Sequence, residues 1–169
     1  MSDRQAEFER VALPHLEGLL RFARRLAKDP SSARDLVQET FLQAWRAFAR
    51  LRPDSNVRAW LFRILVNVHR GEGRKARRMP EVSLLPEASG PPELWAESSM
   101  EVSLGVLEAL DRLPEEQRTV LILGVVEGFT AKEMSEILNV PAGTVMSRLS
   151  RARQAMRNAL SPEAEHVGR

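Results

Sequence analysis

Apolar residues recur three and four positions apart along most of this chain, which is the period of an amphipathic helix. The pattern predicts a first helical stretch over residues 5–28, in which Pro14 marks a kink or a new first turn. A second helix follows Pro30 and runs to about Arg50, and a third runs from residue 57 to about residue 70. Because no alternating strand pattern of useful length is found, the sequence predicts an all-α protein.

Local signals set the expected ends of these helices. Ser32 followed by Asp35 resembles a capping box in which Asp replaces the usual Glu. The Gly-Glu-Gly run at residues 71–73 is expected to end the third helix, just before a cluster of basic residues. Residues 51–56 contain Pro, Asp, Ser and Asn, and we therefore expect them to form a loop.

The middle of the chain has the composition of a linker. Residues 79–99 contain four prolines, several acidic residues and few apolar ones. We expect them to form a flexible tether between two small helical domains, residues 1–78 and residues 100–162. The net charge is +8 over residues 1–80, −8 over residues 81–117 and +2 over residues 118–169. This order is typical of two binding modules that are separated by a different kind of segment.

The second domain carries the signals of a helix-turn-helix. Pro114 suits the first turn of a helix that stops at Gly128. Thr130 and Glu133 form a capping box at the start of a short helix. After it, Asn139 tolerates left-handed backbone, and a last helix opens at Pro141. A short capped helix, a turn and a second amphipathic helix in this order predict a DNA-binding helix-turn-helix.

The outer face of that last helix is rich in hydrogen-bond donors. The residues expected to contact DNA are Thr144, Ser147, Arg148, Arg151 and Arg153. Arginine pairs with guanine through two hydrogen bonds and also neutralises phosphate. The hydroxyl of Thr144 and the free amides of the first turn suit a phosphate. A solvated basic helix face is the alternative, but the capped helix and turn directly before it favour DNA binding.

Two features of the first domain are candidates for binding. Asp35, Gln38 and Glu39 share one face of the second helix, which in isolation is better explained as a solvated surface. The second feature is a group of amide, guanidinium and aromatic side chains around the loop, a combination that suits an unstacked base. Its candidate residues are Leu51, Arg52, Asn56, Arg63, Asn67, Arg74 and Lys75. The tryptophans nearby, Trp45 and Trp60, are expected to belong mostly to the core.

Composition argues against several classes of protein. The chain has no cysteine, which excludes disulfides and thiolate metal sites within it, and its three histidines lie far apart in the sequence. It shows no carboxylate pair, catalytic triad or Gly-rich phosphate loop, so we expect neither an enzyme nor a metal or cofactor. The start of the chain is charged and no apolar run is long enough to span a bilayer. A cytoplasmic location without membrane insertion is therefore expected.

Five motifs, in their order along the chain, are similar to those of the extracytoplasmic-function sigma factors, a group within the sigma-70 family. Residues 35–41 (Asp-Leu-Val-Gln-Glu-Thr-Phe) and 60–67 (Trp-Leu-Phe-Arg-Ile-Leu-Val-Asn) resemble region 2 of that family. Three later motifs resemble region 4 of that family: residues 113–118 (Leu-Pro-Glu-Glu-Gln-Arg), 128–134 (Gly-Phe-Thr-Ala-Lys-Glu-Met) and 141–153 (Pro-Ala-Gly-Thr-Val-Met-Ser-Arg-Leu-Ser-Arg-Ala-Arg). The resemblance covers about residues 5–160, and the order of the motifs makes it specific.

The resemblance implies a subunit that binds core RNA polymerase, recognises the −10 and −35 promoter elements and starts transcription of a specific, stress-related regulon. Asp35, Gln38 and Glu39 would dock on the coiled coil of the largest polymerase subunit. Asn67 would capture a flipped base of the −10 element, with the loop at residues 51–56 closing over it. The helix from Pro141 would read the −35 element, and an anti-sigma factor is an expected partner because such proteins commonly clamp the closed form.

The sequence departs from the family at Met146, where some members carry an arginine that contacts DNA, so a different −35 preference is expected. The long acidic region and the middle domain of housekeeping sigma factors are not found, and the linker is too short for a domain. Three other interpretations compete. A LuxR-type regulator has a similar helix-turn-helix but leaves the N-terminal half unexplained. A helical adaptor would use its basic faces only for solubility, and an enzyme would need a site that the sequence does not show.

Overall fold

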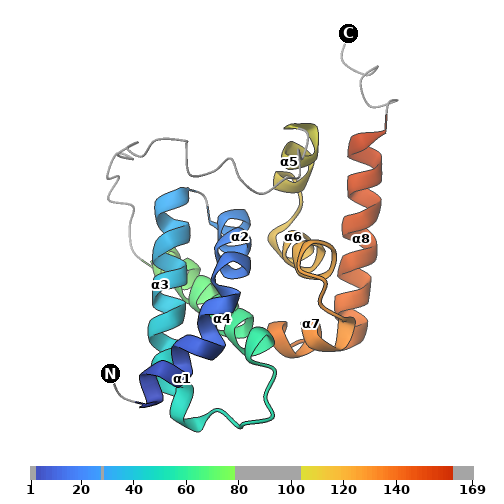
Figure 1. The fold of residues 1–169 in the computed structure, drawn as a ribbon. Coiled ribbons are helices and arrows are strands. Elements are labelled where there is room, and N and C mark those ends of the chain that lie inside the picture. The colour runs from blue at the N-terminus through green and yellow to red at the C-terminus, as the bar shows by residue number, and fades with distance from the viewer. Residues whose placement is uncertain (1–2, 28, 79–103, 162–169) are drawn as a thin grey trace.

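The computed structural model describes residues 3–27, 29–78 and 104–161, and these residues are helical with short connections (Figure 1). The all-α prediction is confirmed for them. The first four α-helices are α1 (Asp3–Ala12), α2 (Leu16–Leu26), α3 (Pro30–Ala47) and α4 (Val57–Arg78). The remaining four are α5 (Leu104–Asp111), α6 (Glu115–Leu121), α7 (Ala131–Leu138) and α8 (Ala142–Leu160). Two 3-10 turns (Leu13–His15 and Phe48–Arg50) and a π-helical turn (Ile122–Val126) complete the elements.

Helices α1 to α4 form the N-terminal unit, in which α3 packs against α2 and α4. Its core side chains come from the predicted apolar stripes, and Leu19, Leu36, Leu61 and Leu65 are almost inaccessible to solvent. Burying a side chain of this size contributes about 1.5–3 kcal/mol relative to leaving it exposed. Trp45 and Trp60 are half-buried and pack against this core, as the sequence predicts.

Two helix ends differ from the predictions. Helix α3 is capped by Asp29, whose carboxylate accepts from the Ser32 amide at 2.9 Å, so Ser32 lies inside the helix and the predicted Ser32–Asp35 box is wrong. Pro30 takes the first helical position, where no amide donor is needed. Helix α4 continues past Gly71 to Arg78 instead of ending near residue 70. Glycine costs a helix only about 1 kcal/mol, and Gly71 does not adopt the left-handed conformation that ends one.

Helices α5 to α8 form the C-terminal unit, and its predicted helix-turn-helix is confirmed. The Thr130 hydroxyl accepts from the Glu133 amide at 3.2 Å and the Glu133 carboxylate accepts from the Thr130 amide at 2.8 Å, which is a complete capping box at the start of α7. Asn139 ends α7 with a φ of 53°, in the left-handed region. Pro141 is the N-cap residue of α8.

The connection between α6 and α7 is unusual. Residues Ile122–Val126 form a π-helical turn, and Gly128 follows with a φ of 71°, a conformation that suits glycine. Between them, the side chain of Glu127 is fully buried. This turn faces α2 of the N-terminal unit.

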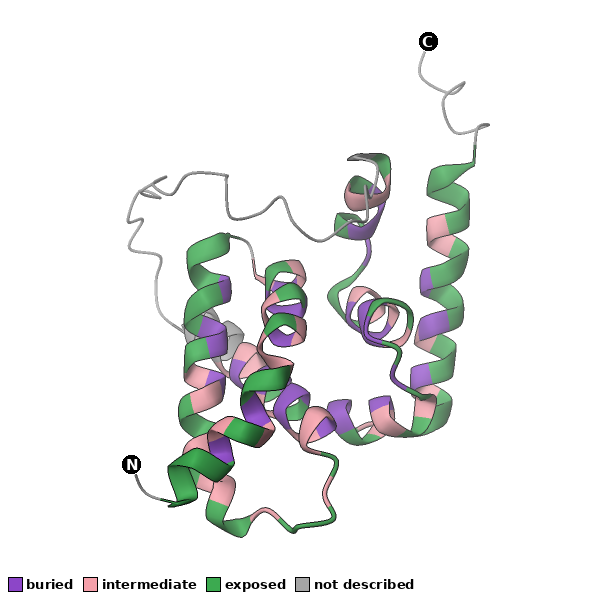
Figure 2. Cartoon of the chain, viewed as in Figure 1, coloured by how far each residue is buried: buried purple, intermediate pink, exposed green. Residues whose placement is uncertain are grey.

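The two units pack against each other along α4 and α7 (Figure 1). Phe62 of the first unit meets Phe129 of the second, with ring centroids 5.0 Å apart and an edge-to-face arrangement. The buried residues of both units form one continuous apolar cluster. Figure 2 shows that the outer sides of α3 and α8 stay exposed in this closed arrangement.

Candidate nucleic-acid interface

The exposed face of α8 holds most of the residues expected to contact DNA. Val145, Leu149 and Ala152 are buried and fix which side of the helix faces the core. Ser147, Arg151 and Arg153 are exposed on other sides, and Thr144 is half-buried in the first turn. The Ser147 hydroxyl donates to the Thr144 carbonyl at 3.0 Å. Ser147 and Arg151 are one turn apart and present a hydroxyl and a guanidinium on the same exposed face.

Arg148 does not lie on that exposed face, so its predicted position is corrected. Its side chain is only 17% exposed and its Nη2 lies 2.8 Å from a carboxylate oxygen of Glu116 in α6. Position 148 directly precedes Leu149 and is three residues after Val145, so it flanks the buried stripe. With Glu116 and with His69 and Arg70 of α4, Arg148 lines a hollow of about 290 Å³ between the units.

The outer side of α4 presents Arg63 and Asn67, both exposed and one turn apart. Asn67 lines a groove of about 610 Å³ between α3 and α4, and that groove also contains Asp35, Gln38 and Glu39. The structure therefore brings Asn67, one member of the second candidate set, into the same groove as all three members of the first set. Arg74 and Lys75 lie further along α4, but their side chains are outside the described residues.

The loop at residues 51–56 does not line the groove that holds Asn67, and its closure over a flipped base stays a prediction. Asn56 precedes α4, and its side-chain oxygen accepts from the Ala59 amide at 3.0 Å. Asn67 is eleven residues further along, about 16 Å at the rise of an α-helix. Elsewhere in the loop, Leu51 is half-buried and Arg52 pairs with Asp54 at 3.4 Å in an exposed position.

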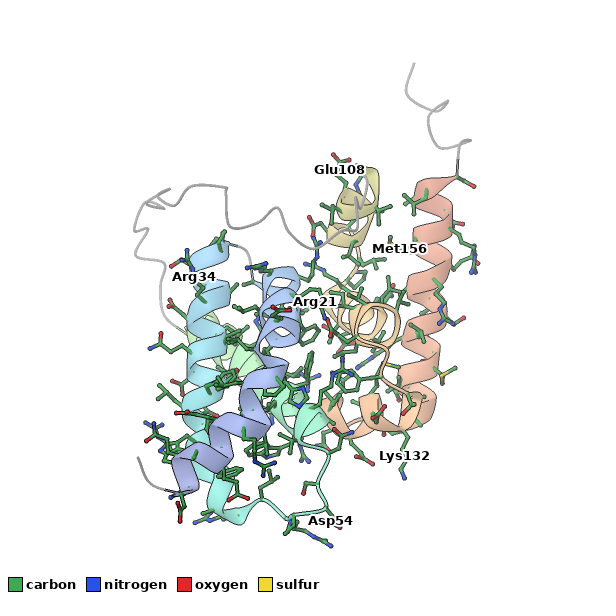
Figure 3. The ribbon with its side chains drawn as sticks, in the orientation of Figure 1. Arg21, Arg34, Asp54, Glu108, Lys132 and Met156 are labelled. Carbon is green, nitrogen blue, oxygen red and sulfur yellow. The ribbon has the colours of Figure 1, made fainter. Side chains whose placement is uncertain are left out.

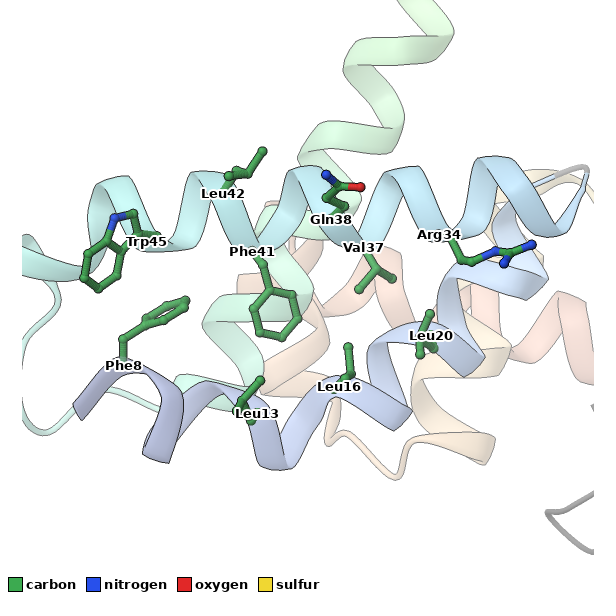
Figure 4. Close-up of a pocket in the computed structure, with 10 residues that line it drawn as sticks. All are labelled: Phe8, Leu13, Leu16, Leu20, Arg34, Val37, Gln38, Phe41, Leu42 and Trp45. Carbon is green, nitrogen blue, oxygen red and sulfur yellow. The ribbon is translucent and has the colours of Figure 1, made fainter. Parts of the chain in front are cut away.

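The acidic face of α3 is accessible. Asp35 and Gln38 are exposed, while Glu39 is half-buried and accepts from the Gln43 side chain at 2.9 Å. Gln38 and Leu42 also border a second groove on the side of α3 that faces α1 and α2, with a volume of about 520 Å³ (Figure 4). The second groove is apolar and is lined mainly by Phe8, Leu13, Leu16, Leu20, Val37, Phe41 and Trp45. Leu13 and Leu42 are 51% and 43% exposed, so α3 forms a ridge with a polar and an apolar flank.

Sequence reasoning missed the polar contacts between the two units. Glu127 accepts hydrogen bonds from Arg21 of α2 and Arg58 of α4, and the bond to Glu127 raises the pKa of the Arg21 guanidinium. Burial, together with the nearby charge of Arg58, lowers the pKa of His15. These residues lie far apart in the sequence, and a lone Glu or Arg in a helical pattern carries no signal of a distant partner.

The described residues contain no group of three acidic, histidine or cysteine side chains placed to hold a metal ion. Within the same residues, no helix is both long enough and apolar enough to cross a membrane.

Comparison with known proteins accounts for both units. The model of sigma-70 region 2 matches residues 12–79 and that of sigma-70 region 4 matches residues 103–156. The RNA polymerase sigma-H factor of Pseudomonas aeruginosa is 30% identical, over 92% of this chain and 86% of its own length. The ECF RNA polymerase sigma factor EcfG of Rhodopseudomonas palustris is 37% identical, over 86% of this chain and 79% of its own.

A solved structure agrees with these relatives. The sigma factor RpoE in complex with the anti-sigma factor NepR from Bartonella quintana has a TM-score of 0.74 and 31% identity, covering 91% of this chain and 96% of that one. The relatives match the N-terminal half as well as the helix-turn-helix, which supports a sigma factor over a LuxR-type regulator. Sigma factors are initiation factors and not enzymes, in agreement with the sequence prediction. The chain belongs to the extracytoplasmic-function sigma factors of the sigma-70 family.

Proposed function

We propose that this sigma factor docks on core RNA polymerase through the ridge of α3 and selects promoters with α4 and α8. The observation that carries this assignment is the separation of exposed polar faces, with acidic and amide groups at the α3–α4 groove and a hydroxyl–guanidinium face on α8. The acidic groups suit a basic protein surface, and the hydroxyl and guanidinium groups suit DNA. We propose that the protein acts in the cytoplasm, where RNA polymerase is located.

The polymerase-docking residues are Asp35, Gln38 and Glu39. They lie on one exposed side of α3, they are not part of the core, and two of them are carboxylates suited to a basic partner surface. The apolar groove on the other flank of the same ridge offers area for the centre of such an interface, since interface centres are less charged than their rims.

The −10 element is proposed to meet the outer side of α4. Asn67 can both donate to and accept from a base edge, whereas Arg63 one turn earlier suits phosphate. Arg74 and Lys75 continue the basic character of this helix. Leu51, Arg52 and Asn56 precede α4, and the loop would have to change conformation before it could cover a base held at Asn67.

The −35 element is proposed to meet α8 in the major groove. Arg151 and Ser147 face outward one turn apart, Thr144 lies in the first turn, and Arg153 extends the basic surface. Met146 is 50% exposed beside them and has no donor, so it can offer only apolar contact to a base. Arg148 joins this set only if it leaves Glu116.

The direct test is transcription in vitro. The purified chain is added to Escherichia coli core RNA polymerase on fragmented genomic DNA, and the start sites of the transcripts are mapped. We expect a small set of start sites that share two sequence elements upstream. A plain regulator would bind duplex DNA without creating new start sites, and a helical adaptor would do neither, so either result would contradict the proposal.

An anti-sigma factor is a further proposed partner. The similar RpoE protein of Bartonella quintana was solved in complex with the anti-sigma factor NepR. We expect affinity purification of this chain from its host to recover a small protein that blocks transcription by the holoenzyme. A chain that is constitutively active in its host and recovers no such inhibitor would contradict this partner.

A further inference from the structure

Met146 is an apolar side chain in the part of α8 that is proposed to read DNA, and it is 50% exposed. Ser147, the next residue, is exposed as well. Ser150 and Arg151 are also exposed and lie one helical turn after Met146 and Ser147. These four side chains form one compact surface in the first half of α8, here called the reading patch.

Packing within the protein accounts for the other methionines that the structure describes. Met134 is 2% exposed and packs against Gly124. Met156 packs against the core, on the side of α8 that faces α5 and α6 (Figure 3). Met146 belongs neither to the core nor to the half-buried side chains around it. A flexible, polarisable apolar side chain in this position is suited to contact with a partner.

Ser147 presents a hydrogen-bond acceptor on the reading patch. Its hydroxyl donates to the Thr144 carbonyl at 3.0 Å. A hydroxyl has one proton and two lone pairs, so with the proton bound inside the helix the Ser147 oxygen can only accept. The base donors in the major groove are the N6 amino group of adenine and the N4 amino group of cytosine. Ser147 therefore favours one of these two bases.

Met146 decides between them, because its thioether can offer a base only apolar contact. The apolar group that the major groove presents is the C5 methyl group of thymine. An A·T pair carries the adenine amino group and the thymine methyl group on the same edge, whereas a G·C pair has an amino group but no methyl group. An apolar side chain and an acceptor at adjacent positions thus match one A·T pair.

The start of α8 also permits close approach to DNA. Ala142 and Gly143 lie one turn before Met146 and Ser147, and both are exposed. Neither has a polar side chain that could compete for a base. A side chain at Gly143 would meet nothing within 4 Å, so packing within the protein does not require a glycine there, although glycine weakens a helix. A bare backbone suits a position that a partner approaches closely.

We propose that Met146 and Ser147 together read one A·T base pair of the −35 element. The Met146 side chain contacts the thymine methyl group, and the Ser147 oxygen accepts from the adenine amino group. This inference rests on the proposed function, in which α8 reads that element. Arg151 lies about 7.5 Å further along the helix axis, the rise of about two base pairs, so the A·T pair lies within about two base pairs of the pair that Arg151 contacts.

The test removes single groups from the DNA. The full chain is bound to Escherichia coli core polymerase, and a promoter library randomised in the −35 element gives the selected sequence. Each thymine on either strand of that element is then replaced by deoxyuridine, which lacks only the methyl group. Competition binding compares the parent with Met146→Ala, Met146→Leu and Leu160→Ala. The last variant removes a 45% exposed apolar side chain from the far end of α8 and is the matched control.

We expect one thymine at which deoxyuridine weakens binding about fourfold in the parent and in Leu160→Ala, which is the effect of losing one buried methyl group. Met146→Ala should lose this penalty, and Met146→Leu should keep most of it. Deoxynebularine, which lacks the amino group of adenine, should weaken binding about threefold or more when it pairs with that thymine. This second penalty should be absent in Ser147→Ala.

The outcomes separate the two residues from the proposed function. A deoxyuridine penalty at no position, or one that persists in Met146→Ala, would overturn the role of Met146. An amino-group penalty that persists in Ser147→Ala would do the same for Ser147, and a selected −35 element without an A·T pair would overturn both. A polymerase complex that selects no −35 sequence at all would contradict the proposed function on which the inference rests.

Discussion

At the scale of single residues, Asn67 and Arg148 show what a sequence pattern can and cannot locate. The helical period correctly places Asn67 at the edge of the core-facing stripe of α4, and the structure leaves it exposed. The same period places Arg148 one position before the buried Leu149, where a long side chain can lie either on the exposed face of α8 or against α6. Its direction depends on Glu116, thirty-two residues earlier in the sequence, and local spacing has no information about that partner.

Asn67→Ala is expected to impair promoter melting and to change the base preference at one −10 position. The amide discriminates between base edges, and because the side chain is exposed its loss should change thermal stability by less than about 0.5 kcal/mol. Permanganate footprinting measures melting, and a premelted template should restore part of the activity. Asn158→Ala, which removes an exposed amide at the far end of α8, is the control. A variant with lower stability and an unchanged −10 preference would make Asn67 a structural brace.

Glu116→Gln is expected to strengthen binding to −35 duplex DNA a few-fold, because it releases Arg148 from its partner. The pair is partly exposed, so the loss of stability should stay below about 1 kcal/mol. Arg151→Ala should weaken binding to the same DNA by about 1–3 kcal/mol if the Arg151 side chain makes a bidentate contact with a base. Fluorescence anisotropy with the selected −35 element measures both. Unchanged affinity in Glu116→Gln would show that Arg148 has a structural role only.

At the scale of elements, features fixed by neighbouring residues were predictable. The box of Thr130 and Glu133, the left-handed Asn139 and the helix start at Pro141 each depend on residues within one turn, and all three are confirmed. The end of α4 was not predictable in this way, since a glycine stops a helix only where its backbone turns left-handed. The π-helical turn at Ile122–Val126 was also missed; it contacts α2 of the other unit, and the spacing of neighbouring residues carries no information about that contact.

The capping box predicts a pH dependence of the C-terminal unit. Hydrogen bonds from Thr130, and a further one from Asn56, lower the pKa of Glu133 below its ordinary value of 4.5. The folded pKa lies below the unfolded one, so this stabilisation is complete above about pH 4.5 and is lost as the pH falls through the folded pKa. Thermal melting of the parent and of Glu133→Gln should therefore differ at neutral pH and converge in acid. A difference that stays constant with pH would contradict this account.

At the scale of the whole molecule, the sequence predicted two helical units with different partners, and the comparisons confirmed the family. The sequence did not predict how the units pack. That packing depends on Arg21 of α2, Arg58 of α4 and Glu127 of the connection between α6 and α7. In the sequence, each of these charged residues looks like an ordinary surface residue. Only the folded chain brings them together.

Charge reversal of Asp35 and Glu39 to lysine is expected to weaken association with core polymerase at least about tenfold while the helical fold is retained. The two side chains are not part of the core, and opposite charges would face the partner surface after the change. Surface plasmon resonance with immobilised core polymerase measures the affinity of each variant. Reversal of Asp54, an exposed acidic residue in the loop before α4, serves as the matched control. If the double variant binds core as tightly as the parent, the docking face lies elsewhere.

The central claim is that one chain reads two promoter elements through two separate helices. It is tested most directly by transcription with Escherichia coli core polymerase from a library of promoters randomised in the −10 and −35 elements. The account predicts that the parent selects both elements, that Asn67→Ala changes the selected −10 sequence only, and that Arg151→Ala changes the −35 sequence only. A parent that selects neither element, or variants that alter the element assigned to the other helix, would contradict it.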